Sequence, residues 1–352
     1  MIPVSPCTTR RRLVCQDDLD LDVELPRSLA DLENDELDQL EGLLQDRLES
    51  LRPREVALQA HASAVTALAW LNDTTLLSAG MDKTVCFVQI DDKSMKVAKR
   101  IILSGGPAHS VLPSSSGVIM GLHSKSLLEL VSPPSSAFLQ DMQYSVLESN
   151  MCGWPRDLTS NGTSLFSASC NEIRQFDTST KKSKVYKLDK GDILSLACTK
   201  DRLFAGTVDG SLFGFVIDPK TGALELRDAR PKAHGGRVTD LHIDRGMLAS
   251  SSYDGTVKLW CLDGLEIVAM SSTRNGARVL AITQAQNGEE GGYLYAAGSD
   301  GSIRVLDPIV LEERRVIVPP GLEEDEGIRQ VACRGGTLVV ATSAGRLICS
   351  EC

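Results

Sequence analysis

Histidine is the side chain best suited to acid–base chemistry near neutral pH, and this chain has five of them. His109, His123 and His242 fall in three different units of the repeat described below, and no cluster of Asp or Glu lies beside them in the sequence. A metal site or an acid–base pair needs several such groups close together. We therefore expect none of these three histidines to be catalytic or to bind a metal.

Sequence spacings that are typical of catalytic centres are missing as well. The chain contains no H-E-x-x-H, no G-x-S-x-G and no P-loop spacing. Its glycines follow Asp or open a strand-like run, as glycines in turns do. We expect a protein that is not an enzyme and that uses no cofactor.

The ten cysteines are scattered through strand-like segments, and no secretory signal precedes them. This usage favours a reducing, intracellular compartment, either cytoplasm or nucleus. Cys349 and Cys352 form one C-x-x-C, but side chains three apart on a strand face opposite sides of the sheet. We expect no zinc or redox site there and no metal site elsewhere.

The elements that would position such side chains are clearest in residues 233–262. Two runs there, around Val238 and Val257, alternate apolar and other residues with a period of two, and a third short run lies between them. Tyr253-Asp254-Gly255 has the composition of a tight turn, because Asp accepts backbone hydrogen bonds and Gly adopts a positive φ easily. Three antiparallel strands therefore fit into thirty residues.

This unit recurs along the chain. Its turn aligns seven times, at Asp82, Ser124, Cys170, Asp209, Asp254, Asp300 and Ala344. The successive spacings are 42, 46, 39, 45, 46 and 44 residues, which is the period of a four-stranded propeller blade. The sequence therefore predicts an all-β fold, a seven-bladed β-propeller of four-stranded blades in residues 54–352.

The best-formed unit resembles the WD-repeat family of beta-propellers. The resemblance rests on a histidine, a serine, a turn aspartate and a tryptophan, which are His234, Ser250, Asp254 and Trp260 in this unit and, without the tryptophan, His61, Ser78 and Asp82 in the first unit. It implies a buried chain of hydrogen bonds that ties a loop to the strands and includes the indole N–H. Cys261 replaces the Asp of the family's Trp-Asp dipeptide, and Val88 stands at the Trp position of the first unit. We expect this set to be structural.

The two ends of the repeat region are complementary. Residues 54–59 look like one strand that precedes the first unit, whereas the last unit has only three strand-like runs. The resemblance implies that an N-terminal strand joins the last blade, which removes an open sheet edge. We expect residues 54–59 to take that place.

The formal net charge of −10 is concentrated near the N-terminus. Residues 17–49 hold thirteen acidic residues and two arginines, and the remainder of the chain is close to neutral. A near-neutral propeller offers no general electrostatic surface to a phosphate backbone, so we expect no direct nucleic-acid partner. No apolar run approaches the roughly 18 residues that a membrane span needs.

The N-terminal region has two parts. Residues 1–27 have no periodicity and are expected to be a flexible terminus. Residues 28–52 predict an amphipathic acidic helix that ends before Pro53. The leucines that would form its binding face are Leu37, Leu40, Leu44, Leu48 and Leu51. Either they pack on this chain's own propeller, or they bind a helical partner.

Three connections are longer than usual, at residues 132–151, 286–292 and 319–327. Long loops on a rigid scaffold are common binding sites, but an acidic run such as Glu323 to Glu326 is typical of a solvated loop.

The resemblance also implies a docking surface, on the face where the inter-blade loops and the Asp turns emerge. Two positions per unit point there, one before the inner strand and one before the turn Asp. They are occupied by Arg237 with Tyr253 and by Arg278 with Ser299, and a weaker alignment adds Trp154. Trp, Tyr and Arg are enriched at interface hot spots. We expect them to bind an acidic peptide or a modified side chain, unless this chain's own acidic segment covers them.

These features predict a non-catalytic scaffold or adaptor, a subunit of an intracellular multiprotein complex. The alternative is a signalling subunit similar to G-protein beta subunits, in which the helix at residues 28–52 pairs with a small helical partner.

Overall fold

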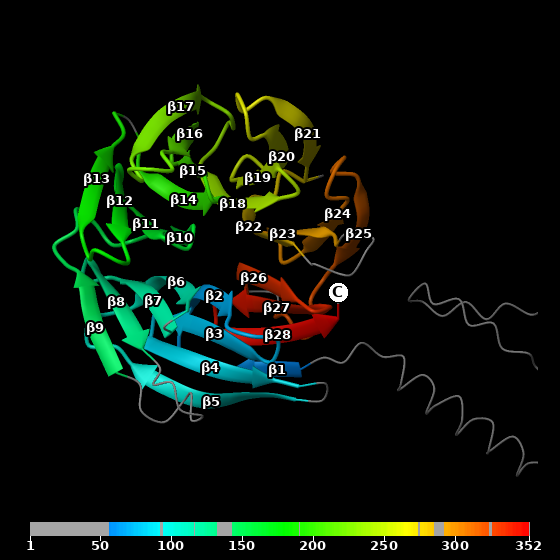
Figure 1. Ribbon diagram of the computed structural model, residues 1–352. Coiled ribbons are helices and arrows are strands. Elements are labelled where there is room, and N and C mark those ends of the chain that lie inside the picture. Colours follow the sequence, from blue (N-terminus) through cyan, green and yellow to red (C-terminus); the bar gives the residue numbers. More distant parts are fainter. Residues whose placement is uncertain are drawn as a thin grey trace, which may run out of the picture. The chain divides into compact units, whose positions relative to one another are not determined.

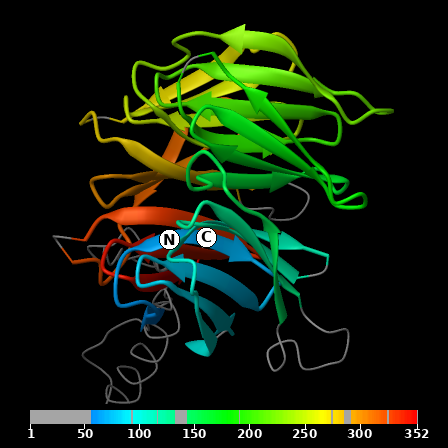
Figure 2. The same cartoon turned by 90° about the vertical axis from the view of Figure 1, so that its left-hand side faces the viewer.

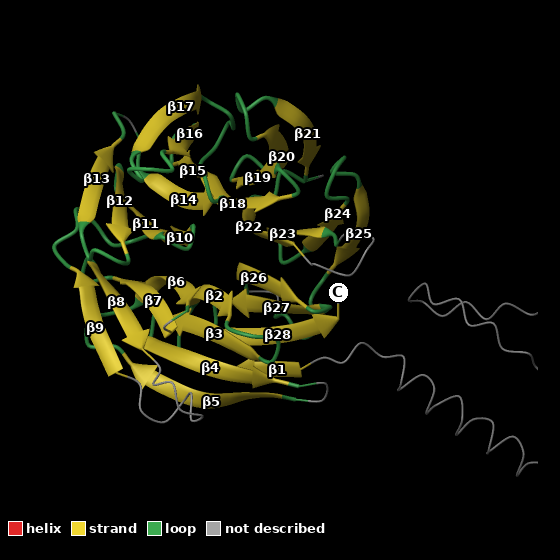
Figure 3. Ribbon diagram, viewed as in Figure 1, coloured by secondary structure: helices red, strands yellow, loops and turns green. Residues whose placement is uncertain are grey.

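The computed structural model describes residues 56–351, apart from residues 92–93, 116, 132–142, 190, 274, 285–291 and 324–325. In this part of the chain, every regular element is a β-strand (Figure 3). The strands form seven antiparallel sheets of four strands each. The terminus at residues 1–27 and the helix expected at residues 28–52 lie outside the described residues.

The seven sheets are the blades of one propeller (Figure 1). From the inner to the outer strand, the first four blades are β2 (Val65–Trp70), β3 (Thr75–Gly80), β4 (Thr84–Ile90) and β5 (Met95–Ile102); β6 (Ala108–Ser114), β7 (Gly117–Leu122), β8 (Ser126–Val131) and β9 (Gln143–Glu148); β10 (Asp157–Ser160), β11 (Ser164–Ser169), β12 (Glu172–Asp177) and β13 (Ser183–Lys187); and β14 (Ile193–Cys198), β15 (Arg202–Thr207), β16 (Leu212–Ile217) and β17 (Leu224–Arg230). The last three are β18 (Val238–Asp244), β19 (Met247–Ser252), β20 (Thr256–Cys261) and β21 (Ile267–Ser272); β22 (Val279–Gln284), β23 (Leu294–Gly298), β24 (Ile303–Leu306) and β25 (Glu313–Ile317); and β26 (Ile328–Arg334), β27 (Thr337–Thr342), β28 (Arg346–Glu351) and β1 (Val56–Gln59).

The inner strands form a closed ring around the central channel. Each inner strand contacts the inner strand of the next blade, and β26 of the last blade contacts β2 of the first. Figure 1 looks along the channel, and Figure 2 shows the same ring from the side. The predicted all-β fold with seven four-stranded blades is therefore confirmed.

Burial explains why a chain with only 4% aromatic residues can fill this core. The second strand of a blade is covered by a neighbouring blade on both faces, and β3, β7 and β11 are buried along their whole lengths. Such strands read as continuous runs of small and aliphatic residues, because large side chains would push the blades apart. The outer strands β13 and β21 are mostly exposed and are therefore more polar or mixed.

The ring is closed by a strand from the other end of the repeat region. β1 pairs with β28 in antiparallel register, from Val56 opposite Cys349 to Gln59 opposite Arg346 (Figure 1). The Gln59 side-chain amide also donates to the carbonyl oxygen of Ala344 at 2.8 Å. The last blade thus has an outer strand from before the first repeat, and β28 has no open edge.

The turns between second and third strands need a left-handed residue. Gly255 supplies it in the fifth blade with φ of +81°, and a Cβ there would lie 2.9 Å from the carbonyl oxygen of Ala277. Lys83 has the same role in the first blade with φ of +64°. Glycine at this position therefore relieves strain and also allows the loop of the next blade to approach.

Two of the long connections differ from expectation. Residues 143–148 of the first are strand β9, the outer strand of the second blade. In the third, Glu326 is buried and is not part of a solvated run, since its side chain is only 3% exposed. Arg346 donates to its carboxylate at 3.1 Å, and the Thr342 hydroxyl donates to it at 3.3 Å. Composition does not reveal this ion pair, because Glu326 lies in the connection before β26 and Arg346 is the first residue of β28.

Candidate functional site

The histidine, serine, aspartate and tryptophan of the fifth blade form one directed chain of hydrogen bonds. The Trp260 indole N–H donates to the Ser250 hydroxyl at 2.8 Å, and this hydroxyl lies 2.7 Å from Nε2 of His234. On the other side of the ring, Nδ1 of His234 lies 2.8 Å from the Thr256 hydroxyl, which donates to Asp254 at 2.6 Å. Each hydroxyl can accept one bond and donate the next only if Nδ1 carries the proton.

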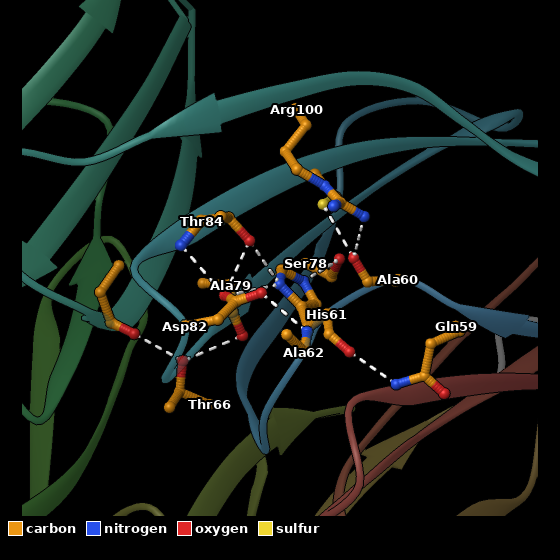
Figure 4. Close-up of polar contacts among 12 residues, drawn as sticks. Gln59, Ala60, His61, Ala62, Thr66, Ser78, Ala79, Asp82, Thr84 and Arg100 are labelled. Atoms are coloured by element: carbon orange, nitrogen blue, oxygen red, sulfur yellow. Dashed lines mark hydrogen bonds and ion pairs between the residues drawn. The ribbon is translucent and has the colours of Figure 1, made fainter.

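The first blade repeats this arrangement without the tryptophan (Figure 4). Nε2 of His61 lies 2.9 Å from the Ser78 hydroxyl, and Nδ1 lies 2.8 Å from the Thr84 hydroxyl and 3.1 Å from Asp82. Val88 is fully buried at the tryptophan position, so Ser78 has no indole donor.

The electrostatics of these sets suit a structural role. Burial lowers the pKa of His234 to about 4, so the ring is neutral at physiological pH. Burial alone would raise the pKa of Asp254, but hydrogen bonds from Thr256 and from the Gly235 N–H outweigh it and lower this pKa. The histidine is 2% exposed, and its two nitrogens are already engaged. A ring with both nitrogens committed inside the protein has no substrate to act on.

The chain of hydrogen bonds also includes a threonine, which was not predicted from the sequence. Thr84 and Thr256 each follow the turn aspartate by two residues, and their hydroxyls bridge the histidine to the carboxylate. Ser302 bonds Asp300 from the same position in the sixth blade. The D-x-T or D-x-S that recurs at four of the seven turns, those of Asp82, Asp209, Asp254 and Asp300, was the available signal.

The rim positions expected to bind a partner lie on one face of the ring. The Tyr253 N–H donates to the carbonyl of Arg237 at 3.1 Å, and the Ser299 N–H donates to the carbonyl of Arg278 at 2.8 Å. The same backbone bond joins Met81 to Ala64, His123 to Pro107, Val208 to Asp192 and Ser343 to Gly327. We call the surface formed by these residue pairs the turn face. The recurring bond means that equivalent positions in these blades present their side chains on this face.

Two arginines and one tyrosine form a stack on the turn face. The guanidinium carbon of Arg237 lies 4.7 Å from the centre of the Tyr253 ring, and that of Arg278 lies 5.0 Å from it. Both distances are within the range of cation–π attraction. The stack joins the fifth blade to the sixth and holds two guanidinium groups close together.

A second aromatic cluster corrects the expectation for the histidines. His109 and His123 both belong to the second blade and not to different units, and their rings are joined by a 2.9 Å contact between Nε2 and Nδ1. Trp154 reaches them from the third blade, with ring centres 4.9 Å from His109 and 4.3 Å from His123. Arg156 lies 5.6 Å from the Trp154 ring centre. Burial, with the charges of His123 and Arg156, lowers the pKa of His109 to about 4.

The two clusters border one cavity of about 250 Å³. Its lining is made of aromatic, arginine and small apolar side chains: His109, Trp154, Arg156, Leu194, Arg237, Thr239, Tyr253, Leu280 and Arg329. Several of these are the second residue of an inner strand, as Leu194, Leu280 and Arg329 are. The cavity therefore lies where the inner strands begin, at the mouth of the central channel, and we call it the mouth cavity.

Two carboxylates connect neighbouring blades along the inner strands. Asp157 accepts from the Leu196 N–H of the next blade at 2.6 Å, and Asp240 accepts from the Ile282 N–H at 3.0 Å. Burial raises the pKa of Asp240 to about 7, and burial together with the charge of Asp240 raises the pKa of Asp157 to about 7. Each carboxylate thus accepts a hydrogen bond that joins two blades, but its burial disfavours its ionised form.

We expect Asp240→Asn to make the protein more stable at pH 8. The folded-state pKa of Asp240 is above its unfolded value, so wild-type stability falls as pH rises from about 4 to about 7. Asparagine removes this loss and keeps one acceptor for the Ile282 N–H, but it gives up the second acceptor, which bonds the Leu241 N–H. A gain of about 1–3 kcal/mol is expected at pH 8, below the full value of the shift because the residue is only partly buried. Urea unfolding at pH 5 and pH 8 measures it.

The control for this variant is Asp189→Asn, which changes an exposed carboxylate by the same chemistry. His61, His234 and His242 have the opposite pH dependence. Burial lowers their pKa values, so the stability that they contribute increases as pH rises toward 6.5, and it does so equally in wild type and in the Asp240→Asn protein. An Asp240→Asn protein with the same pH slope as wild type would contradict the assignment.

The remaining predicted sites are less informative. The leucine face at residues 28–52 and Cys352 lie outside the described residues. Among the side chains that the structure describes, no three His, Cys, Asp or Glu residues come together as a metal site would require. Within the same residues, no helix has the length and apolar character of a membrane span.

Comparisons with known proteins agree with the geometry. The family described as WD domain, G-beta repeat, matches residues 53–88 and 229–261, which hold the two histidine sets. The WD40 beta propeller domain of Doa1 superimposes with a TM-score of 0.69 at 17% identity, covering 83% of this chain and 94% of that one. The computationally designed Ika8 protein superimposes with a TM-score of 0.61 at 18% identity, covering 84% and 99%.

Two fungal sequences are also similar. Ribosome biogenesis protein YTM1 of Phaeosphaeria nodorum is 22% identical over 276 residues, which are 68% of this chain and 56% of that protein. Ribosome biogenesis protein ytm1 of Pyrenophora tritici-repentis is 22% identical over 270 residues, which are 66% of this chain and 56% of that protein. The matched part of this chain thus corresponds to little more than half the length of these relatives.

Proposed function

Because this chain belongs to the WD-repeat family of beta-propellers, we propose that it is a non-catalytic scaffold subunit of an intracellular complex that acts in ribosome assembly. Propellers of this kind serve protein interaction, and the name shared by the two fungal relatives supports the choice of complex. An intracellular location, cytoplasmic or nuclear, goes with this role.

One observation carries the interaction role most directly. The Arg237–Tyr253–Arg278 stack is on the turn face, and no carboxylate within the described residues is in ion-pair distance of either arginine. Elsewhere in the ring, buried or half-buried arginines such as Arg174 and Arg304 are paired with acidic side chains. Two guanidinium groups that contact an aromatic ring and have no carboxylate partner among the described residues are the usual composition of an interface hot spot.

We expect the triple variant Arg237→Ala, Tyr253→Ala and Arg278→Ala to lose its partner while keeping its melting curve. These side chains contact each other on the surface, so their removal leaves the buried hydrogen-bond chains intact. Affinity purification with mass spectrometry from cells that make the protein should recover ribosome-assembly proteins with wild type and not with the triple variant.

A matched control is Arg227→Ala with Arg315→Ala, two exposed arginines on the outer strands β17 and β25. It removes the same charge from another surface. Recovery of the same partners by the triple variant would refute the role of the stack, and recovery of no ribosome-assembly protein by wild type would refute the choice of complex.

The N-terminal region is proposed as a second contact. If the leucines of residues 28–52 bind a helical partner, that partner should be recovered with the full chain and lost with a chain shortened to residues 54–352. Partners retained by the shortened chain are then assigned to the propeller.

A further inference from the structure

We propose that the mouth cavity binds an anionic side chain, a carboxylate or a phosphate, of an acidic peptide segment in a partner protein. This inference rests on the proposed role as an interaction subunit and names the chemistry that the site recognises.

The lining of the mouth cavity is positively charged. Arg156, Arg237 and Arg329 line the cavity, and Arg278 stands beside it in the tyrosine stack. Among the described residues that line the cavity, none is acidic. Within the part of the chain that the structure describes, none of these four arginines has a carboxylate in ion-pair distance. Among the described residues nothing neutralises this positive charge, in a ring region that is otherwise close to neutral.

Aromatic side chains hold three of these arginines in place. Tyr253 holds Arg237 and Arg278, and Trp154 lies against Arg156 and the joined histidines. A guanidinium fork that is already positioned loses less side-chain entropy when it binds an oxyanion. Arginine also presents parallel N–H groups that match the two oxygens of a carboxylate or phosphate. The arrangement of the arginines, and not only their charge, therefore favours an oxyanion.

The aromatic contacts argue against single-stranded nucleic acid as the ligand. Nucleic-acid binding of that kind relies on open aromatic faces for stacked bases and on a groove that follows the backbone. Here the Tyr253 ring is in contact with two guanidinium groups, and the Trp154 ring is in contact with two imidazoles and a third guanidinium. These contacts use the surface that a base would need.

Size selects a side chain over a free small molecule. A cavity of about 250 Å³ is smaller than the roughly 300–1,000 Å³ of ordinary small-molecule sites. Its lining includes Leu194 and Leu280, whose side chains offer no hydrogen bonds to a polar metabolite. An Asp, Glu or phosphorylated side chain that enters from the rim can reach the arginines while the rest of its peptide lies on the turn face.

The test is a titration of the full-length protein with three fluorescently labelled peptides that differ in one feature. One peptide has a run of glutamates, the second has phosphoserines at those positions, and the third has glutamines. We expect the anionic peptides to bind and the glutamine peptide not to bind, with the stronger of the two identifying the natural oxyanion. Arg237→Glu with Arg329→Glu should weaken that binding by about tenfold or more.

The matched control is Arg227→Glu with Arg315→Glu, which changes the net charge equally but on outer strands. It should leave peptide binding unchanged and thereby separate the cavity from general electrostatics. Equal binding of the glutamine peptide, an equal loss in the control, or tighter arginine-dependent binding of a labelled oligouridine would overturn the proposal. Peptide binding that persists when no ribosome-assembly protein is recovered from cells would refute the proposed complex and leave the cavity assignment standing.

Discussion

A chain that begins at Ala60 should be less stable than one that begins at Arg54 by roughly 3–5 kcal/mol, and it should self-associate. The two differ only by the segment that contains β1. Without it, β28 loses the backbone partners from Cys349 to Arg346, and the bond from Gln59 to Ala344 disappears. Leu58, which is partly buried and packs against the core opposite Leu347, is lost as well.

The reason for the large effect is that the lost strand closes a ring. An exposed β28 is an unpaired edge that can add a strand from another molecule. Urea unfolding gives the free-energy difference, and light scattering gives the association. The full-length protein is the control, since it shares β1 with the chain that begins at Arg54. Two shortened chains with equal midpoints and equal mass would show that β1 does not hold the ring closed.

Much of the ring could be predicted because a propeller is built from one repeated sequence unit. The turn at Asp254 and its equivalents fixed the period, and the period fixed the number of blades, which the structure confirms. The outer strand β9 could not be predicted in this way. Outer strands such as β9 are exposed, so they lack the alternating pattern that burial of one face imposes. Residues 143–148 therefore looked like part of a long connection.

The candidate site was predicted only where the resemblance supplied a template. Arg237, Tyr253 and Arg278 stand at template positions, and the structure places them together. The contact between His109 and His123 was not predicted. The two residues are fourteen positions apart, one near the start of β6 and the other in the turn after β7. No sequence motif indicates such a contact, which depends on the pairing of β6 with β7 in the blade.

Arg156 and Arg329 were missed for a different reason. They stand at the second position of the inner strand or its equivalent, which lines the channel mouth. In other blades this position is Thr239 or Leu280, so the column shows no common residue type. The position also serves the fold in some blades, since the Thr239 hydroxyl donates to the carbonyl oxygen of Val279 in the next blade. A search for one repeated residue type therefore does not find Arg156 and Arg329.

The second large effect is expected at Ser250. Its hydroxyl bonds one buried donor, the Trp260 indole N–H, and one buried acceptor, Nε2 of His234. Ser250→Ala should cost about 3 kcal/mol, because both the Trp260 indole N–H and Nε2 of His234 lose their partner inside the protein. Ser78→Ala in the first blade should cost only about 1–2 kcal/mol, because Ser78 serves His61 alone and Val88 has no polar group. Both serines are fully buried, so the two substitutions differ mainly in the number of stranded partners.

A double-mutant cycle separates this network from ordinary packing. Trp260→Phe removes the indole N–H, so adding Ser250→Ala to it should strand only His234 and cost about 1 kcal/mol less than Ser250→Ala alone costs in wild type. Urea unfolding of wild type, the two single variants and the double variant gives the coupling. Additive losses, or equal costs at Ser250 and Ser78, would mean that the tryptophan bond contributes nothing. The expected coupling would instead explain how a blade with Trp260 can be more rigid than one with Val88, beside the stack that we propose as a point of contact.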